Sequence, residues 1–394
     1  MAGWSAIAGT HGFVVPDQAH AQGLVTALAT HGFALVTARS GHGNGWLVTA
    51  FDEGPYPADT AGHRTIDAVG RQAAALARQH GGYPHGGSRC DPSMLQFYRT
   101  EAPIVQTNPG TRPPIPTVIL TPAPPATPLA LTPDSDSSAT VDLTGLDAIH
   151  WTHLEHAHGS AEDVPGLIRA LARNSDDWVE VLDELFGDDL LHQGTCYSAT
   201  APAMPFIVGL AAAGALPASR RLDLFLVLLF ASDRWADSLL GDADRAAAEN
   251  RRPGAAPWTQ DVHQSIGNEL PALLARWDAE PPATQYVLAC LAALYPQHGR
   301  QVIHQISALA ADHAGTQSGA YLQLADALMR DDRDRALTIA YDIVNWAEDL
   351  DPGWLDAPGA SATLKAGHIL AEGAARTAQT TAFDEQKPAP TRPG

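Results

Sequence analysis

The first hundred residues change repeatedly between two patterns of apolar and polar positions. Residues 18–30 and 60–80 carry apolar side chains at the spacing of one helical face, and each therefore predicts an amphipathic helix. Strands are indicated where β-branched and aromatic residues gather, at 4–8, 33–37, 46–51 and 94–98. The resulting order β-α-β-β-α-β predicts a ferredoxin-like α+β domain over residues 1–100.

A glycine-rich loop, Gly41-His42-Gly43-Asn44-Gly45, stands between two of these strands. A glycine loop that binds phosphate follows a strand and opens a helix. This one joins a strand to a strand, so we expect a hairpin turn instead.

Proline dominates the next segment. Ten of the residues from 101 to 133 are prolines, and a polar run of Asp and Ser follows at 134–138. This composition predicts an extended linker over residues 101–145. At the other end of the chain, residues 378–394 are rich in Thr, Gln and Pro and are expected to form a disordered tail.

Residues 146–377 have a helical pattern almost throughout, and a short motif recurs in them. A proline, any residue and then two aliphatic residues occur at Pro165, Pro205 and Pro271, where each proline is expected to open or kink an apolar helix. A second amphipathic helix is expected after each copy, at 177–186, 220–239 and 284–295. The first two copies are 40 residues apart, and a polar insertion at 242–257 separates the second from the third. Helix pairs at such a period are typical of a HEAT-like α-solenoid.

Two stretches carry a resemblance to known families. The runs 151–165 and 192–201 resemble the openings of repeats in a bacterial HEAT-like family that occurs mainly in actinobacteria, often near polymorphic toxins. That resemblance implies an immunity or scaffold protein. Residues 27–33, 46–51 and 81–83 resemble the ribonuclease E inhibitor B family, which implies a partner among RNA-processing enzymes.

Charge separates the two halves of the chain. The formal net charge of the 394 residues is −20. Residues 1–100 hold six arginines and six acidic residues, whereas residues 151–394 hold 17 basic and 33 acidic ones. This balance argues against general binding of nucleic acids or anionic membranes and favours a basic protein partner.

The location of the protein is inferred from its cysteines and apolar runs. Three widely spaced cysteines give no disulfide framework, which favours a reduced cytoplasm. The N-terminus lacks a signal-peptide pattern, and the longest apolar run has eight residues, too few to span a bilayer.

A histidine-rich run suggests metal binding as one hypothesis. His150, His153 and His156 recur at every third residue, with Glu155 and His158 beside them. Zinc and di-iron sites use such residues, but no second ligand set is evident. The alternative is a capping helix over 147–158 with exposed imidazoles, and we assign no metal or cofactor.

A Cys196–His192 dyad is the one nucleophilic arrangement that the spacing suggests. The alternative is a helix cap, with Thr195 as the N-cap and His192 at the end of the preceding helix. We favour the cap and assign no catalytic residues.

These observations favour a non-enzymatic protein-binding or scaffold protein, of immunity type, whose acidic helical repeats bind a basic partner. Trp151 and Trp258, near helix starts, are expected to be exposed anchors. The candidate partner-binding residues are Trp151, His153, His156, Asp163, Asp183, Glu184, His192, Gln193 and Tyr197. Two alternatives stay open: a HEAT-like DNA glycosylase, and a modulator of an RNA-degrading enzyme that acts through residues 1–100.

Overall fold

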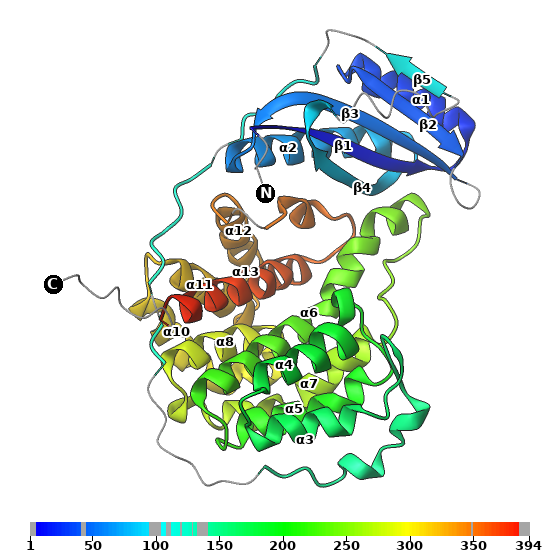
Figure 1. Ribbon diagram of the computed structural model, residues 1–394. Coiled ribbons are helices and arrows are strands. Elements are labelled where there is room, and N and C mark those ends of the chain that lie inside the picture. The colour runs from blue at the N-terminus through cyan, green and yellow to red at the C-terminus, as the bar shows by residue number, and fades with distance from the viewer. Residues whose placement is uncertain are drawn as a thin grey trace, which may run out of the picture. The chain divides into compact units, whose positions relative to one another are not determined.

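The computed structural model describes residues 5–40, 45–93, 104–107, 112–118, 120–127, 129–131, 141–347 and 350–385 (Figure 1). The chain divides into two compact units. The first, the α/β unit, comprises residues 1–122 with 242–253 and 356–359. The second, the helical unit, comprises residues 123–241, 254–355 and 360–394. Each unit is described by itself.

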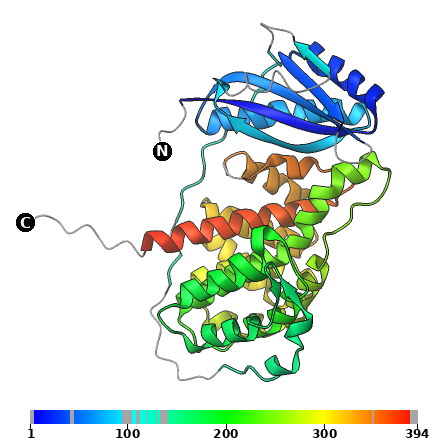
Figure 2. The same ribbon diagram turned by 45° about the vertical axis from the view of Figure 1, so that its right-hand side comes forward.

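The α/β unit is a five-stranded antiparallel sheet with two helices. Its strands and helices follow the chain as β1 (Ala6–Val15), α1 (Gln18–Thr30), β2 (Leu35–Ser40), β3 (Trp46–Pro57), α2 (Thr60–Gln79), β4 (Tyr83–Cys90) and β5 (Ile104–Thr107). The strand order is β4-β1-β3-β2-β5, and every neighbouring pair is antiparallel. Strand β1 pairs with β3 on one side and β4 on the other, and β3 is the central strand; Figure 2 gives a second view of the sheet.

Both helices pack on one face of this sheet because their apolar faces meet the same strand residues. Leu24 and Leu28 of α1 and Val69 of α2 are fully buried in one cluster with Val36 of β2 and Val48 of β3. Asp17 and Asp59 cap the two helices, since each accepts a hydrogen bond from a backbone N–H of the first turn. The amphipathic helices predicted at 18–30 and 60–80 are therefore confirmed to within one residue.

The strands agree with the prediction in part. Strands β2 and β3 form the expected hairpin, in which Ser40 pairs with Trp46; residues 41–44 between them lie outside the described residues. The strand expected at 94–98 also lies outside the described residues. Strand β1 is longer than expected and reaches Val15. The fold is thus a small antiparallel sheet with helices.

The expected linker over residues 101–145 is not a free spacer along its length. Residues Ile104–Thr107 form β5, which adds to β2 at the sheet edge. Further on, Leu129 is only 3% exposed and belongs to the core of the helical unit. The backbone there is held as well, since Gln317 N–H donates to Pro125 O at 3.2 Å. Backbone pairing and one buried leucine therefore fix segments whose proline content predicted an extended chain.

The helical unit is built almost entirely from helices around one large apolar core. Its helices are α3 (Val164–Arg173), α4 (Trp178–Asp183), α5 (Thr200–Ala212), α6 (Ala218–Ala248, of which 218–241 belong here), α7 (Thr259–Leu274), α8 (Pro282–Ala293), α9 (Pro296–Gly299), α10 (Ile303–Asp312), α11 (Gln317–Met329), α12 (Arg333–Val344) and α13 (Ala362–Glu385). A π-helical segment, Glu184–Leu190, continues α4. Helix α6 is buried nearly all round from Leu222 to Arg234, which accounts for its long apolar run.

The three proline motifs lie in helices that contact one another in succession. Pro165 stands in the first turn of α3, whereas Pro205 and Pro271 lie inside α5 and α7. Helix α3 packs on α5, and α5 packs on α7 (Figure 1). Later in the chain the packing changes, because α11 contacts α8, α10, α12 and α13.

Two expectations for the helical part are wrong. The segment 147–158 is not a capping helix: it contains the 3₁₀ turn Trp151–His153 and a short hairpin of Glu155–His156 with Gly159–Ser160. Gly159 makes this tight turn possible, with a φ of 123° that other residues rarely adopt. The helix expected at 220–239 is too short, because α6 runs from Ala218 to Ala248 and includes the first part of the polar insertion 242–257.

Among the helices that the structure describes, none combines the length and the apolar character needed to cross a membrane.

Candidate functional site

The histidine-rich run forms a compact polar cluster around His156, which we call the His156 cluster. The imidazole of His156 is 7% exposed. Its Nε2 lies 3.2 Å from Asp163 Oδ1, and its Nδ1 lies 3.2 Å from Asp189 Oδ1. The backbone N–H of His158 also donates to His156 Nδ1, at 3.0 Å. The backbone N–H of Ala157, in the same hairpin, donates to Asp189 O at 3.1 Å and ties the hairpin to the end of the π-helical segment.

These contacts leave little for a metal ion at His156. Because Nδ1 accepts an N–H, the ring proton of neutral His156 resides on Nε2 and is donated to Asp163. Neither nitrogen then offers a free lone pair. Burial raises the pKa of Asp189 against the opposing effect of His156. The hydrogen bonds of His156 with Asp163 and with the His158 backbone are best described as a structural network.

The other predicted partner-binding residues lie in different environments. His192 is half-buried, with its ring 5.5 Å from that of the exposed His158. Gln193 is exposed in a left-handed turn with φ 51°. His153 is exposed, and Tyr197 is half-buried.

The two tryptophans expected as exposed anchors differ. Trp258 is 48% exposed, which agrees with the expectation. Trp151 is only 5% exposed and donates from its indole Nε1 to Leu146 O at 2.8 Å, so it is a core residue.

Residues 192–200 form neither of the two arrangements considered for them. Burial raises the pKa of the Cys196 thiol to about 12, against the opposing charge of Arg234, so the thiolate that a nucleophile requires is disfavoured. Thr195 is not an N-cap, because the next helix begins only at Thr200. It is the Thr200 hydroxyl that donates to Leu190 O, at 2.7 Å, and thereby ties the preceding π-helical segment to this helix start.

Exposed acidic residues gather on α4, on the turn before it and on the π-helical segment after it. We call this surface the α4 acidic face; its exposed members are Asp176, Asp177, Glu180, Asp183, Glu184 and Asp188. Trp178, Val181 and Leu185 point inward and are buried. In the described part of the chain, none of these six carboxylates forms an ion pair with an arginine. Asp183 and Glu184, two predicted partner-binding residues, lie at its centre.

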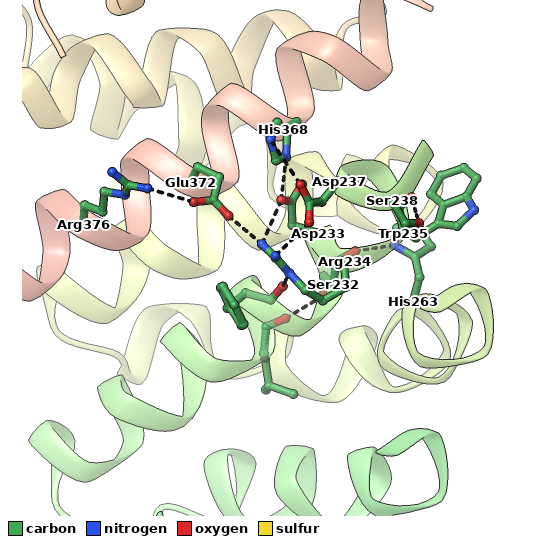
Figure 3. Close-up of polar contacts among 12 residues, drawn as sticks. Ser232, Asp233, Arg234, Trp235, Asp237, Ser238, His263, His368, Glu372 and Arg376 are labelled. Carbon is green, nitrogen blue, oxygen red and sulfur yellow. Dashed lines mark hydrogen bonds and ion pairs between the residues drawn. The ribbon is translucent and has the colours of Figure 1, made fainter. Parts of the chain in front are cut away.

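A second cluster joins α6 to α13 and was not expected from the sequence (Figure 3). Asp233 and His368 are 1% and 0% exposed, and Asp233 Oδ2 lies 2.6 Å from His368 Nδ1. Arg234 bridges further carboxylates, at 2.5 Å from Glu372 and 3.0 Å from Asp237. We call these five residues the α6–α13 network.

The charges in this network shift one another's pKa. Burial lowers the pKa of His368, but the carboxylates of Asp233, Asp237 and Glu372 outweigh it, so the net shift is upward. Burial also raises the pKa of Asp233, which its contact with His368 opposes. Two buried atoms, Asp233 Oδ1 and His368 Nε2, have no hydrogen-bond partner among the described residues.

The donor set of Asp233, His368 and Glu372 resembles a metal site in composition but not in contacts. The guanidinium of Arg234 already holds Glu372 and lies 3.4 Å from Asp233 Oδ2. A fixed positive charge at the carboxylates opposes a cation there. An ion-pair network that connects two helices fits these residues better.

A cavity of about 190 Å³ lies beside this network, between α6, α7, α9 and the start of α13. Trp235 and His263 form one wall, with ring centroids 5.1 Å apart, and Tyr295 stacks behind His263 at 4.4 Å. Close approach of Tyr295 depends on Gly267, where a Cβ atom would lie 2.9 Å from the tyrosine ring.

The sequence contained one usable signal for the network. Asp233 and Arg234 follow the eight-residue apolar run 224–231 after a single serine, and they continue a helix that is buried nearly all round. Charged residues at buried helical positions need partners. The partner, His368, is 135 residues away, so no spacing rule could identify it.

Comparisons with known proteins give no assignment: no protein family, curated protein or solved structure matches the chain.

Proposed function

We propose that this chain is a non-enzymatic protein-binding protein, of scaffold or immunity type, that acts in the cytoplasm and binds a basic partner protein through the α4 acidic face. The observation that carries the proposal is the set of six exposed carboxylates without an arginine partner in the described chain. Elsewhere in the helical unit, acidic residues such as Asp326 and Glu280 are held by arginines. Unpaired charge on one surface favours encounter with a partner of opposite charge.

The construction of the α4 acidic face suits binding. Trp178 is fully buried beneath it, and the Arg220 guanidinium lies 5.4 Å from the Trp178 ring centroid. Val179 is 65% exposed among the carboxylates and offers an apolar contact. The segment continues as a π-helix, a rare conformation that is frequent at functional sites. A rigid base under a charged surface lowers the entropy lost on binding.

The proposal extends to the architecture of the two units. We infer that the α/β unit is ferredoxin-like, which is supported by β4-β1-β3-β2 order with antiparallel neighbours and both helices on one face. We infer that the first part of the helical unit is HEAT-like. This is supported by the contacts of α3 with α5 and of α5 with α7, the three helices that contain the proline motifs.

Affinity capture with three baits tests the binding proposal. The first is the wild-type chain, and the second carries Glu180→Gln, Asp183→Asn and Glu184→Gln. The third, a matched control, carries Asp261→Asn, Asp278→Asn and Asp312→Asn, which remove the same charge from exposed positions on other elements. A basic protein captured from a host-cell lysate by the wild type is then titrated against each bait.

We expect the α4 variant to lose about tenfold in affinity and the control to lose much less, because each exposed charge contributes up to about 1 kcal/mol. Raising the salt from about 0.05 M to about 0.3 M should weaken wild-type binding for the same reason. Equal affinity for all three baits, or capture that does not respond to salt, contradicts the proposal.

A further inference from the structure

The cavity beside the α6–α13 network has a wall suited to a flat ligand. Trp235 and His263 line it from α6 and α7, with a tilt of 38° between their rings. Leu294, Leu364 and Gly367 add apolar surface, and the exposed Ser361 places an opening beside the start of α13. Sites for drug-sized molecules occupy roughly 300–1,000 Å³, so about 190 Å³ suits a single ring with one small substituent.

The imidazole of His263 gives the cavity a hydrogen-bond acceptor. His263 Nδ1 lies 2.9 Å from the carbonyl oxygen of Ser232. A carbonyl oxygen can only accept, so Nδ1 carries the ring proton and Nε2 keeps a lone pair. Burial lowers the pKa of His263, against the opposing Ser232 hydrogen bond, and the imidazole is therefore neutral at pH 7. The Thr363 hydroxyl is a further polar group in the lining.

The charge around the cavity selects against ionised ligands. None of the lining residues in the described chain is a lysine or an arginine that would pair with an anion, so an anionic ligand would be buried without a partner. A cation gains little, because the charge of Asp233 is already met by His368 at 2.6 Å and Arg234 at 3.4 Å. What remains favourable is a neutral molecule with a hydrogen-bond donor.

We propose that this cavity is a binding site for a small uncharged ligand, with a flat apolar ring that packs against Trp235 and an N–H or O–H group that donates to His263 Nε2. This site is independent of the α4 acidic face and adds a small-molecule ligand to a protein-binding surface.

Three probes of the same size test the chemistry of the ligand in the full-length wild-type protein. Benzamide is neutral with N–H donors, benzoate is an anion and benzylammonium is a cation. Two-dimensional NMR follows the indole N–H of Trp235, which is assigned by its absence in Trp235→Phe. We expect benzamide to shift this resonance in the millimolar range. It should bind about tenfold more tightly than benzoate, which has no donor for His263 Nε2, since a buried hydrogen bond contributes about 1 kcal/mol or more. It should also bind more tightly than benzylammonium, whose N–H groups can donate but whose charge would be buried without a partner.

Three variants locate the site. Ala236→Leu fills the cavity from α6 and should abolish benzamide binding, whereas Ala272→Leu, at an exposed position on α7, should leave it unchanged. His263→Phe keeps a ring against Tyr295 but lacks the acceptor, and should weaken benzamide about tenfold. The proposal is overturned if the wild type binds no benzamide, if benzoate binds equally well, or if Ala236→Leu binds benzamide like the wild type. The preference of the wild-type protein for benzamide over the two ions tests the proposal even where a variant does not fold.

Discussion

At the scale of single residues, burial changes the pKa of side chains in this protein. In the α/β unit, His11 of β1 lies edge-to-face against Phe33, with ring centroids 6.1 Å apart. Its Nε2 is buried without a hydrogen-bond partner among the described residues. Gly70 makes room for the ring, because a Cβ atom there would lie 2.8 Å from His11 Nδ1. Burial lowers the pKa of His11 to about 4, against a smaller opposing effect of Asp67.

The half-buried His11, whose Nε2 is fully buried, predicts a pH-dependent stability of the α/β unit. The unfolded chain binds a proton at His11 near pH 6.5, but the folded chain does so only near pH 4. The unfolded state therefore takes up more protons between these values, and stability falls as the pH drops from 6.5 towards 4. By this difference, wild-type unfolding at pH 5 should cost about 2 kcal/mol less than at pH 7.

The control is His11→Gln, which removes the titrating group. Chemical denaturation of both proteins at pH 7 and pH 5 provides the comparison. If the free energy of unfolding changes with pH equally in the variant and the wild type, the contribution of His11 is refuted.

Whole elements are joined by charge as well as by apolar packing. Helix α6 carries Asp233 and Arg234, and α13 carries His368 and Glu372, which pair across the two helices (Figure 3). Trp354 packs edge-to-face on His368 at 4.1 Å and covers the ion pair. A buried ion pair adds little net stability but fixes the relative position of the two side chains. The loss of one partner is costly because the other charge stays buried without a partner.

A double-mutant cycle tests this connection between the helices. His368→Phe leaves the carboxylate of Asp233 buried without its imidazole, and should reduce the free energy of unfolding by about 3 kcal/mol or more. The double variant Asp233→Leu with His368→Phe removes both charges and should be less destabilised than the two single variants predict together. Unfolding followed by circular dichroism measures all three; strictly additive losses would show that the two side chains do not act as a pair.

At the scale of the whole molecule, the segment between the two units takes part in their folding. It begins with β5 on the sheet edge, and its later part lies along the helical unit, where Ala283 N–H donates to Ala130 O at 3.5 Å. Leu129 anchors this part in the core. A proline-rich composition is compatible with such an extended path. Because prolines have no backbone N–H, the segment forms few hydrogen bonds within itself, and its carbonyl oxygens can accept hydrogen bonds from the helical unit.

Leu129 and Leu120 provide a matched pair within this segment. Leu129 is 3% exposed, whereas Leu120 is 39% exposed. Leu129→Ala should destabilise the helical unit by about 2 kcal/mol or more through the cavity that it leaves. Leu120→Ala should change the stability by less than about 0.5 kcal/mol. Thermal unfolding followed by far-ultraviolet circular dichroism compares them, and equal melting temperatures for the two variants would mean that the segment is not anchored.

The sequence by itself determined the local elements and the distribution of charge. The helices at 18–30 and 60–79, and the acidity of the helical part, follow from residues that are near one another in the chain, so that periodicity and counting suffice. The tertiary structure alone decided what distant residues do together. Strand β5 depends on backbone hydrogen bonds that leave no side-chain pattern, and the turn at Gly159 depends on a backbone angle. Asp233 meets His368 only because α13 packs beside α6, a contact that the separate apolar faces permit but do not specify.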